Sequence, residues 1–137
     1  MQDHCLSLTL VLMEVKTDTK ERFHVIRVET PDLSENLAAD LNRQLVELLK
    51  DTIKNVVLNL STVKSISEEA AENLVRTQQK FYENDASFVI CEITNEVDRF
   101  LDEKELLEMM NVTPTESEAY DIVQMEEIER ELLGGED

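Results

Sequence analysis

The amino-acid sequence predicts an α/β fold: one domain with a mixed sheet of four to five strands and four helices. Two nearly continuous apolar runs, at 56–60 and 88–91, are typical of strands covered on both faces. Amphipathic helical patterns alternate with these runs, which favours parallel strands joined by right-handed crossovers. Near the start of the chain, only a short polar stretch separates two strand patterns, so these predict an antiparallel hairpin.

The first half of the chain contains this hairpin and one helix. Leucines at every second position predict a strand over about 6–15, the polar stretch 16–21 predicts a turn, and residues 22–29 predict the second strand. Pro31 ends that strand, and Ser34 is the candidate N-cap of a helix that stops near Asp51. The inward face of this helix consists of five leucines at helical spacing: Leu37, Leu41, Leu45, Leu48 and Leu49.

The middle of the chain repeats a strand and helix order. We expect a third strand at 53–60, a helix at about 68–82 and a fourth strand at 87–92. Thr94 can cap a short helix whose inward residues are Val97, Phe100 and Leu101. After an irregular turn, a very short fifth strand is expected near Val112.

The last helix has two competing start signals. Residues 113–116 offer a capping Thr followed by Pro at the first helical position, whereas Thr115 and Glu118 form an alternative capping box. Either register carries the helix to about Leu133. The domain is expected to span 1–137, with a core at about 6–123 and an extended acidic C-terminal helix. The predicted inward stripe of this helix is Ala119, Ile122, Met125, Ile128 and Leu132.

Acidic residues are concentrated in the last third of the chain. The net charge is −18, and the segment from Glu92 to the end holds 16 acidic and 3 basic residues. Such a surface repels phosphate backbones and anionic lipid, which argues against nucleic-acid or membrane partners and favours proteins with basic faces. Alternatively, the negative charge only keeps the protein soluble and has no binding partner. With no signal-peptide pattern and no apolar run near 18 residues, we expect a cytoplasmic protein.

Several enzyme classes lack the residues that they need. The only glycines are Gly134 and Gly135, so a glycine-rich phosphate loop is absent from the body of the domain. His4 and His24 do not adjoin a predicted nucleophile, and Cys5 and Cys91 have no metal-ligand spacing. The sequence therefore predicts no enzyme, no catalytic residues, no metal and no cofactor.

One segment resembles a known family of bacterial regulatory domains. The residues Val57-Leu-Asn-Leu-Ser-Thr-Val-Lys-Ser-Ile-Ser-Glu-Glu-Ala-Ala-Glu-Asn-Leu-Val75 are similar to the pattern V-L-D-L-S-x-V-x-x-I-D-S-S-G-L-x-x-L of STAS domains, the fold of anti-sigma factor antagonists. Residues 27–37 resemble the family's R-L-x-G-x-L-D segment, 88–91 its fourth strand and 117–120 the start of its last helix. The resemblance implies a non-enzymatic regulator that binds an anti-sigma factor with serine kinase activity.

The resemblance also indicates the candidate site. At the position of the family's phosphorylated serine this chain has Glu68, which implies that the usual phosphorylation switch is missing unless Ser67 replaces it. Glutamate carries one negative charge, less than a phosphoserine. These residues can also have a purely structural role. Ser67 would cap the helix that begins at about residue 68, and the acidic residues in the first turn would stabilise that helix. The predicted partner-binding residues are Ser34, Ser67, Glu68, Glu69, Glu72 and Arg76.

Two other functions remain as alternatives. The same fold serves as a cytoplasmic accessory subunit of membrane transporters, which predicts association with an ATPase rather than an anti-sigma kinase. A small acid-dependent enzyme would instead show a deep pocket containing a carboxyl group with a raised pKa. The sequence also leaves homodimer formation open.

Overall fold

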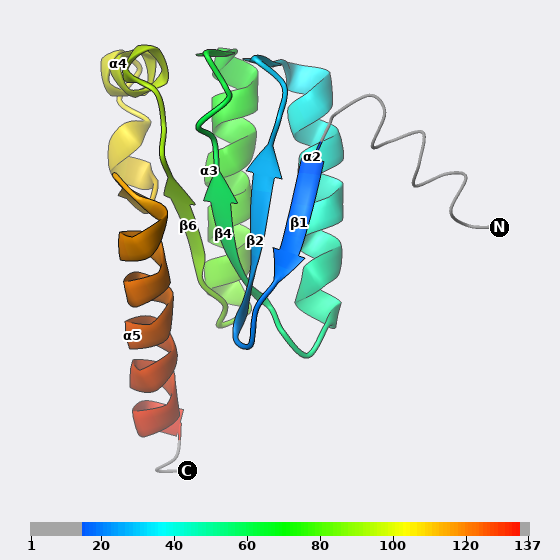
Figure 1. Cartoon of the computed structure of the whole chain (residues 1–137), viewed down its shortest axis with the longest axis vertical. Coiled ribbons are helices and arrows are strands. Elements are labelled where there is room, and N and C mark those ends of the chain that lie inside the picture. Colours follow the sequence, from blue (N-terminus) through cyan, green and yellow to red (C-terminus); the bar gives the residue numbers. More distant parts are fainter. Residues whose placement is uncertain (1–14, 135–137) are drawn as a thin grey trace, which may run out of the picture.

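A five-stranded mixed sheet forms the centre of the computed structural model, which describes residues 15–134. In this part of the chain, α2 and α3 cover one face of the sheet and α5 lies against the other (Figure 1). The strand order is β1-β2-β4-β6-β7. The strands are β1 (Val15–Thr19), β2 (Phe23–Val28), β4 (Asn55–Asn59), β6 (Phe88–Cys91) and β7 (Val112–Thr113).

The pairing agrees with the topology predicted from the sequence. β1 and β2 form an antiparallel hairpin, whereas β2, β4, β6 and β7 run parallel to one another. β4 is therefore an internal strand, and its residues Val57 and Leu58 are fully buried on opposite faces. The α/β fold, the mixed sheet and the order of its elements are confirmed for the described residues.

Four α-helices lie within residues 15–134, and each starts near a predicted capping residue. The Ser34 Oγ accepts a hydrogen bond from the Leu37 N–H (3.4 Å), and the Thr94 Oγ1 accepts one from Val97 (3.4 Å). At the last helix the Thr115 register is confirmed, because the Thr115 Oγ1 accepts from the Glu118 N–H (3.2 Å). The helices are α2 (Glu35–Glu47), α3 (Glu68–Glu83), α4 (Asn95–Glu103) and α5 (Glu116–Gly134), with 3-10 turns η1 (Leu48–Lys50) and η2 (Leu107–Met109).

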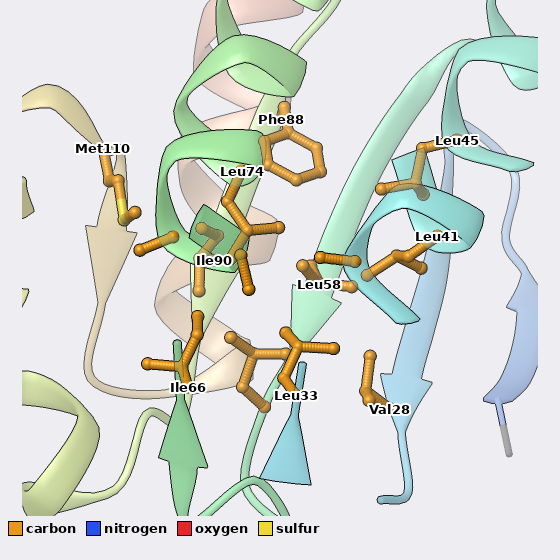
Figure 2. Close-up of a cluster of buried hydrophobic side chains, with 14 of the residues drawn as sticks. Val28, Leu33, Leu41, Leu45, Leu58, Ile66, Leu74, Phe88, Ile90 and Met110 are labelled. Atoms are coloured by element: carbon orange, nitrogen blue, oxygen red, sulfur yellow. The ribbon is translucent and has the colours of Figure 1, made fainter. Parts of the chain in front are cut away.

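The larger core lies between the sheet and the pair α2 and α3. Figure 2 shows Leu41 and Leu45 of α2 and Leu74 of α3 gathered against Leu58 and Ile90 of the sheet. These five side chains are 2% exposed or less. Leu41 and Leu45, four residues apart, therefore lie on the inward face that the leucine spacing predicted. Burial of this kind contributes roughly 1.5–3 kcal/mol per large side chain.

A smaller core lies on the opposite face, beneath α5. Phe23, Val57 and Val89 of the sheet pack against Ala119 and Val123 of α5. The ring of Phe23 also lies 4.8 Å, centroid to centroid, from that of Tyr120. α5 is thus held by apolar contacts only through its first half.

The structure corrects the expected hairpin boundaries. Residues 16–19 were expected in a turn, but they form most of β1, and the turn lies at 20–22. All four side chains are exposed, because β1 is an edge strand whose charged residues need no burial. The strand expected over 6–14 lies outside the described residues.

The predicted inward stripe of α5 is wrong beyond Ile122. Met125, Ile128 and Leu132 are 61%, 51% and 68% exposed. The sheet surface beneath this half of the helix is polar, since it presents buried Asn55 and Ser87. Polar side chains of α5 therefore face the sheet, and the apolar ones face outward.

Candidate functional site

A small parallel sheet brings the starts of α2 and α3 to one edge of the molecule. β3 (Asp32–Leu33) pairs with β5 (Ser65–Ile66), so the next residues, Ser34 and Ser67, lie beside each other. The Ser67 N–H donates to the Leu33 carbonyl oxygen at 3.2 Å, which fixes this arrangement. The two N-capping serines predicted for the site thus come together, although 33 residues separate them in the sequence.

Ser67 has a clear structural role. Its Oγ accepts a hydrogen bond from the Ala70 N–H at 3.0 Å, so it is the N-cap of α3. Its backbone is extended, as capping requires, and its side chain is half-buried. A hydroxyl engaged in this way stabilises the helix by about 1 kcal/mol.

Glu68 and Glu69 begin α3, and both are exposed. Their charges favour the N-terminus of the helix through the macrodipole. The Glu68 Oε1 also lies 3.7 Å from the Nζ of Lys104, which follows α4. Both side chains are more than two-fifths exposed, so the ion pair contributes little, about 0–1 kcal/mol, and a partner could replace it.

The remaining predicted residues lie further along α3. Glu72 and Arg76 are exposed and follow Glu68 at intervals of four residues, which places them along the same outer side of the helix. Arg76 donates a 3.4 Å hydrogen bond to Asn73. The candidate site is therefore a cluster of Ser34, Ser67, Glu68 and Glu69 with an extension along α3.

Lys104 is the part of the site that the sequence analysis missed. It caps the end of α4, and its Nζ lies 5.8 Å from the centre of the Phe100 ring. No residue spacing indicates its contact with Glu68, because the approach of α4 to the start of α3 depends on the tertiary fold. The Thr94 Oγ1 helps to set this approach by donating to the Val63 carbonyl oxygen (3.0 Å).

A second polar cluster joins α5 to the sheet. Glu116 accepts hydrogen bonds from Asn59 (2.7 Å) and Tyr120 (2.8 Å) and pairs with Arg27 (2.9 Å). Burial alone would raise the pKa of this carboxyl group, but the hydrogen bonds and the guanidinium charge outweigh burial and lower the Glu116 pKa. A general acid would need the opposite shift.

The buried thiol of Cys91 lies in the same region. Burial, together with the charges of Glu116 and Glu92, raises the pKa of Cys91 to about 12. A thiol in this state is a poor nucleophile.

The cavity beside α4 is separate from the candidate site. It has a volume of about 430 Å³, lies between α4 and β7, and contains one carboxylate, that of Asp98. Within residues 15–134, no group of three or more His, Cys, Asp or Glu side chains could hold a metal ion. In the same part of the chain, no helix has both the length and the apolar character needed to cross a bilayer.

Comparison with known proteins identifies the fold. Residues 14–119 match the family model of the STAS domain. Similar solved structures include an anti-sigma factor antagonist from Mycobacterium paratuberculosis (17% identity, TM-score 0.70, covering 82% of this chain and 94% of that one). A putative anti-sigma factor antagonist from Thermotoga maritima has 19% identity and a TM-score of 0.68, over 80% of this chain and 94% of its own.

A transporter also contains a similar fold. The inward-facing murine anion transporter of the solute carrier 26 family has 10% identity and a TM-score of 0.62, over 88% of this chain and 24% of the transporter. No curated protein sequence matches the chain.

Proposed function

This chain belongs to the STAS domain family, and we propose that it is a non-enzymatic regulator that binds a protein partner as anti-sigma factor antagonists do. The partner of this class is an anti-sigma factor with serine kinase activity. The binding surface consists of the paired starts of α2 and α3 with the exposed outer side of α3. Its residues are Ser34, Ser67, Glu68, Glu69, Glu72 and Arg76.

The pairing of β3 with β5 is the observation that carries this proposal. It brings two helix starts, two capping serines and two exposed carboxylates to one surface. A surface of this kind suits contact with another protein better than the enclosure of a small substrate.

The proposed regulator works without the family's phosphorylation switch. Glu68 has no hydroxyl group to accept a phosphate, and its single charge is permanent. Ser67 is the only adjacent acceptor, but its Oγ is engaged as the α3 cap. Mass spectrometry after incubation with ATP and the copurified kinase tests this directly: unmodified Ser67 is expected, and stoichiometric phosphate on Ser67 would mean that the switch has moved.

Binding measurements on Glu68 variants test the function itself. Proteins captured from a native lysate are identified, and the affinity of the purified partner is then measured by calorimetry. If the partner has adapted to a permanent charge, Glu68→Lys weakens binding more than tenfold, or about 1.4 kcal/mol, whereas Glu68→Ser weakens it less. Unchanged affinity in both variants would remove Glu68 from the binding surface.

The sign of the Glu68→Ser effect has a further meaning. If Glu68 imitates the phosphorylated state that releases the partner, Glu68→Ser strengthens binding instead of weakening it. Thermal melts of both variants separate binding from folding, because the lost helix-dipole interaction changes stability by less than about 1 kcal/mol. Glu105→Gln, at an exposed position two residues beyond the neighbouring α4, is a matched control for the loss of one carboxylate.

An accessory role in a membrane transporter is the second candidate function. The transporter neighbour supports it through its fold alone. Copurification with a transporter ATPase, and no anti-sigma kinase, would favour this role.

A further inference from the structure

The outer face of α5 presents apolar side chains that nothing in the described structure covers. Met125, Ile128 and Leu132 are spaced by three and four residues, so they lie on one side of the helix, and each is more than half exposed. The family match ends at residue 119, before these three residues. A row of large apolar groups on a solvent-facing helix is typical of a docking surface.

A groove adjoins this face between the ends of α3 and α5. Its volume is about 610 Å³, and Tyr82 and Leu133 form its apolar walls, at 77% and 72% exposure. Four carboxylates line the same groove, those of Glu83, Asp85, Glu126 and Glu129. Its one cation, Arg130, is directed to the sheet, where it donates to Asn55 and Ser87 at 3.2 Å. The groove is thus apolar in its walls and negative at its rim.

The acidic residues here differ in their partners: Glu126 accepts hydrogen bonds from Ser87 and Asn111, which attach α5 to the sheet. The C-terminus of a helix favours cations, yet the last turn of α5 contains no basic residue and does contain Glu131, whose carboxylate lies 3.6 Å from the Arg22 guanidinium. Glu129 has no hydrogen-bond or ion-pair partner among residues 15–134, and neither does the Asp85 carboxylate. The carboxylates of Glu129 and Asp85, which lack such partners among the described residues, are consistent with recognition of a positive ligand.

We propose that the outer face of α5 and the adjoining groove bind a basic amphipathic segment of a partner protein. Its apolar residues would contact Met125, Ile128 and Leu132, and its Lys or Arg side chains would reach Glu129 and Asp85. A second copy of this chain does not fit by charge, because the protein carries −18 and α5 itself is acidic. Residues 1–14 contain no Lys or Arg, so they also lack the complementary charge.

The outer face of α5 and its groove are separate from the candidate site that contains Glu68, on which the proposed function rests. The site with Glu68 lies at the start of α3, whereas the groove lies at its end. Sixteen helical residues separate the two by about 24 Å. In Figure 1, α3 starts at the top of the view, whereas α5 runs down past the sheet and ends near the bottom.

Fluorescence anisotropy with a designed peptide tests the proposal on the full-length protein. The probe is a labelled 16-residue helical peptide with Leu at spacings of three and four and Lys or Arg elsewhere. A scrambled peptide of equal composition controls for charge alone. We expect the periodic peptide to bind at least tenfold more tightly than the scrambled one, and binding without this preference would overturn the proposal.

Two variants separate the apolar and the charged contributions. Ile128→Ser with Leu132→Ser leaves the net charge unchanged and should weaken peptide binding at least tenfold. Glu129→Lys should weaken it similarly, whereas Glu103→Lys, the same charge change at the exposed end of α4, should weaken it less than threefold. Thermal melts confirm that each variant is folded. Equal losses for the two lysine variants, or no loss for the serine variant, would overturn the proposal.

Other occupants of the face give different results. If a second copy covers it, sedimentation shows a dimer that the serine variant dissociates. If residues 1–14 cover it, Leu10→Asp in the full chain strengthens peptide binding. Either result would assign the surface to the chain itself and overturn the proposal, whereas a monomer and an unchanged affinity support it.

Discussion

The carboxylate of Glu116 is held by three neighbours at the carboxyl ends of the parallel strands. Arg27 and Asn59 reach it from β2 and β4, and Tyr120 reaches it from the next turn of α5. Its own backbone N–H donates to the Glu92 Oε2 at 3.0 Å, so a second carboxylate caps the start of the helix. In α/β folds this edge of the sheet often holds a ligand. Here its polar groups satisfy one another and attach α5 instead.

Replacement of Glu116 is expected to change the pH dependence of stability. The folded state lowers the Glu116 pKa, so its contribution is present above the unfolded pKa, about 4.3, and disappears as the pH falls through the folded value. Glu116→Gln should therefore cost about 1–3 kcal/mol at pH 7 and progressively less below pH 4. Urea unfolding at several pH values measures this, with Glu129→Gln on the outer side of α5 as the control. A constant difference from pH 7 to pH 3 would contradict the assignment.

Cys91 is expected to be unreactive in the folded protein. With a pKa of about 12 and full burial, its thiolate is scarce at pH 8 and inaccessible to reagents. In a Cys5→Ser variant, which leaves Cys91 as the only thiol, a thiol reagent should label the native protein negligibly over an hour. The same protein in denaturant should be labelled completely. Stoichiometric labelling of the native protein would show that α5 opens readily.

At the scale of elements, helix ends reveal how the chain manages without internal glycine. Two residues beyond the end of α3 and of α4 lies a residue in the left-handed conformation, Asp85 (φ 58°) and Glu105 (φ 60°). In each case the following N–H bonds back to the helix, from Ala86 to the Phe81 carbonyl and from Leu106 to the Leu101 carbonyl, both at 2.9 Å. Glycine is the usual residue at this position because it has no Cβ. Both helices therefore carry a local conformational cost.

Glu105→Gly is expected to stabilise the protein. Removing the left-handed strain raises the free energy of unfolding by about 1–2 kcal/mol. The greater entropy of glycine in the unfolded chain lowers it by about 0.5–1 kcal/mol. The net increase in the free energy of unfolding is about 0.5–1 kcal/mol. Glu103→Gly, two residues earlier and still helical, should instead destabilise by about 1 kcal/mol. Denaturant titrations of both variants compare the two effects, and equal destabilisation would contradict this account.

The caps of α2, α3 and α4 could be predicted from local sequence, whereas the orientation of α5 could not. Ser34, Ser67 and Thr94 act on residues three positions ahead, so short spacing contains the relevant information. The face that α5 turns to the sheet depends on Asn55 of β4 and on Ser87, just before β6, both far away in the sequence. Met125, Ile128 and Leu132 have a helical spacing typical of a buried stripe, and only the polar sheet surface reverses this interpretation.

Ser67→Ala tests the capping role that the sequence and structure both assign. Loss of the hydrogen bond to the Ala70 N–H should lower the free energy of unfolding by about 1 kcal/mol, and Ser67→Asp should retain most of it. Chemical denaturation measures both variants. If Ser67→Ala left stability unchanged, the hydroxyl would be available for another function, including phosphorylation.

At the scale of the whole molecule, the order of elements followed from the sequence because each apolar run or helical spacing lies within a single segment. The strand directions followed from the alternation of these segments along the chain. The boundaries of β1 did not, because an edge strand with exposed Lys16 and Asp18 has the composition of a turn. The candidate site was predicted in its serines and glutamates but not in Lys104, whose contact with Glu68 exists only in three dimensions.

The uneven covering of the sheet predicts a graded pattern of amide exchange. β4 is paired on both sides and buried on both faces, so its amides should exchange only by global unfolding. The last turns of α5 rest on few apolar contacts, and residues 131–133 are exposed, so their amides should exchange through local fraying at much lower free energy. Hydrogen exchange measured by mass spectrometry should therefore rank β4 and α3 slowest, β1 intermediate and residues 128–134 fastest.

Because the proposed basic segment binds the fast-exchanging end of α5, adding the designed peptide should slow exchange there and leave β1 unchanged. Protection of residues 128–134 equal to that of β4 in the free protein would mean that the end of α5 is already covered.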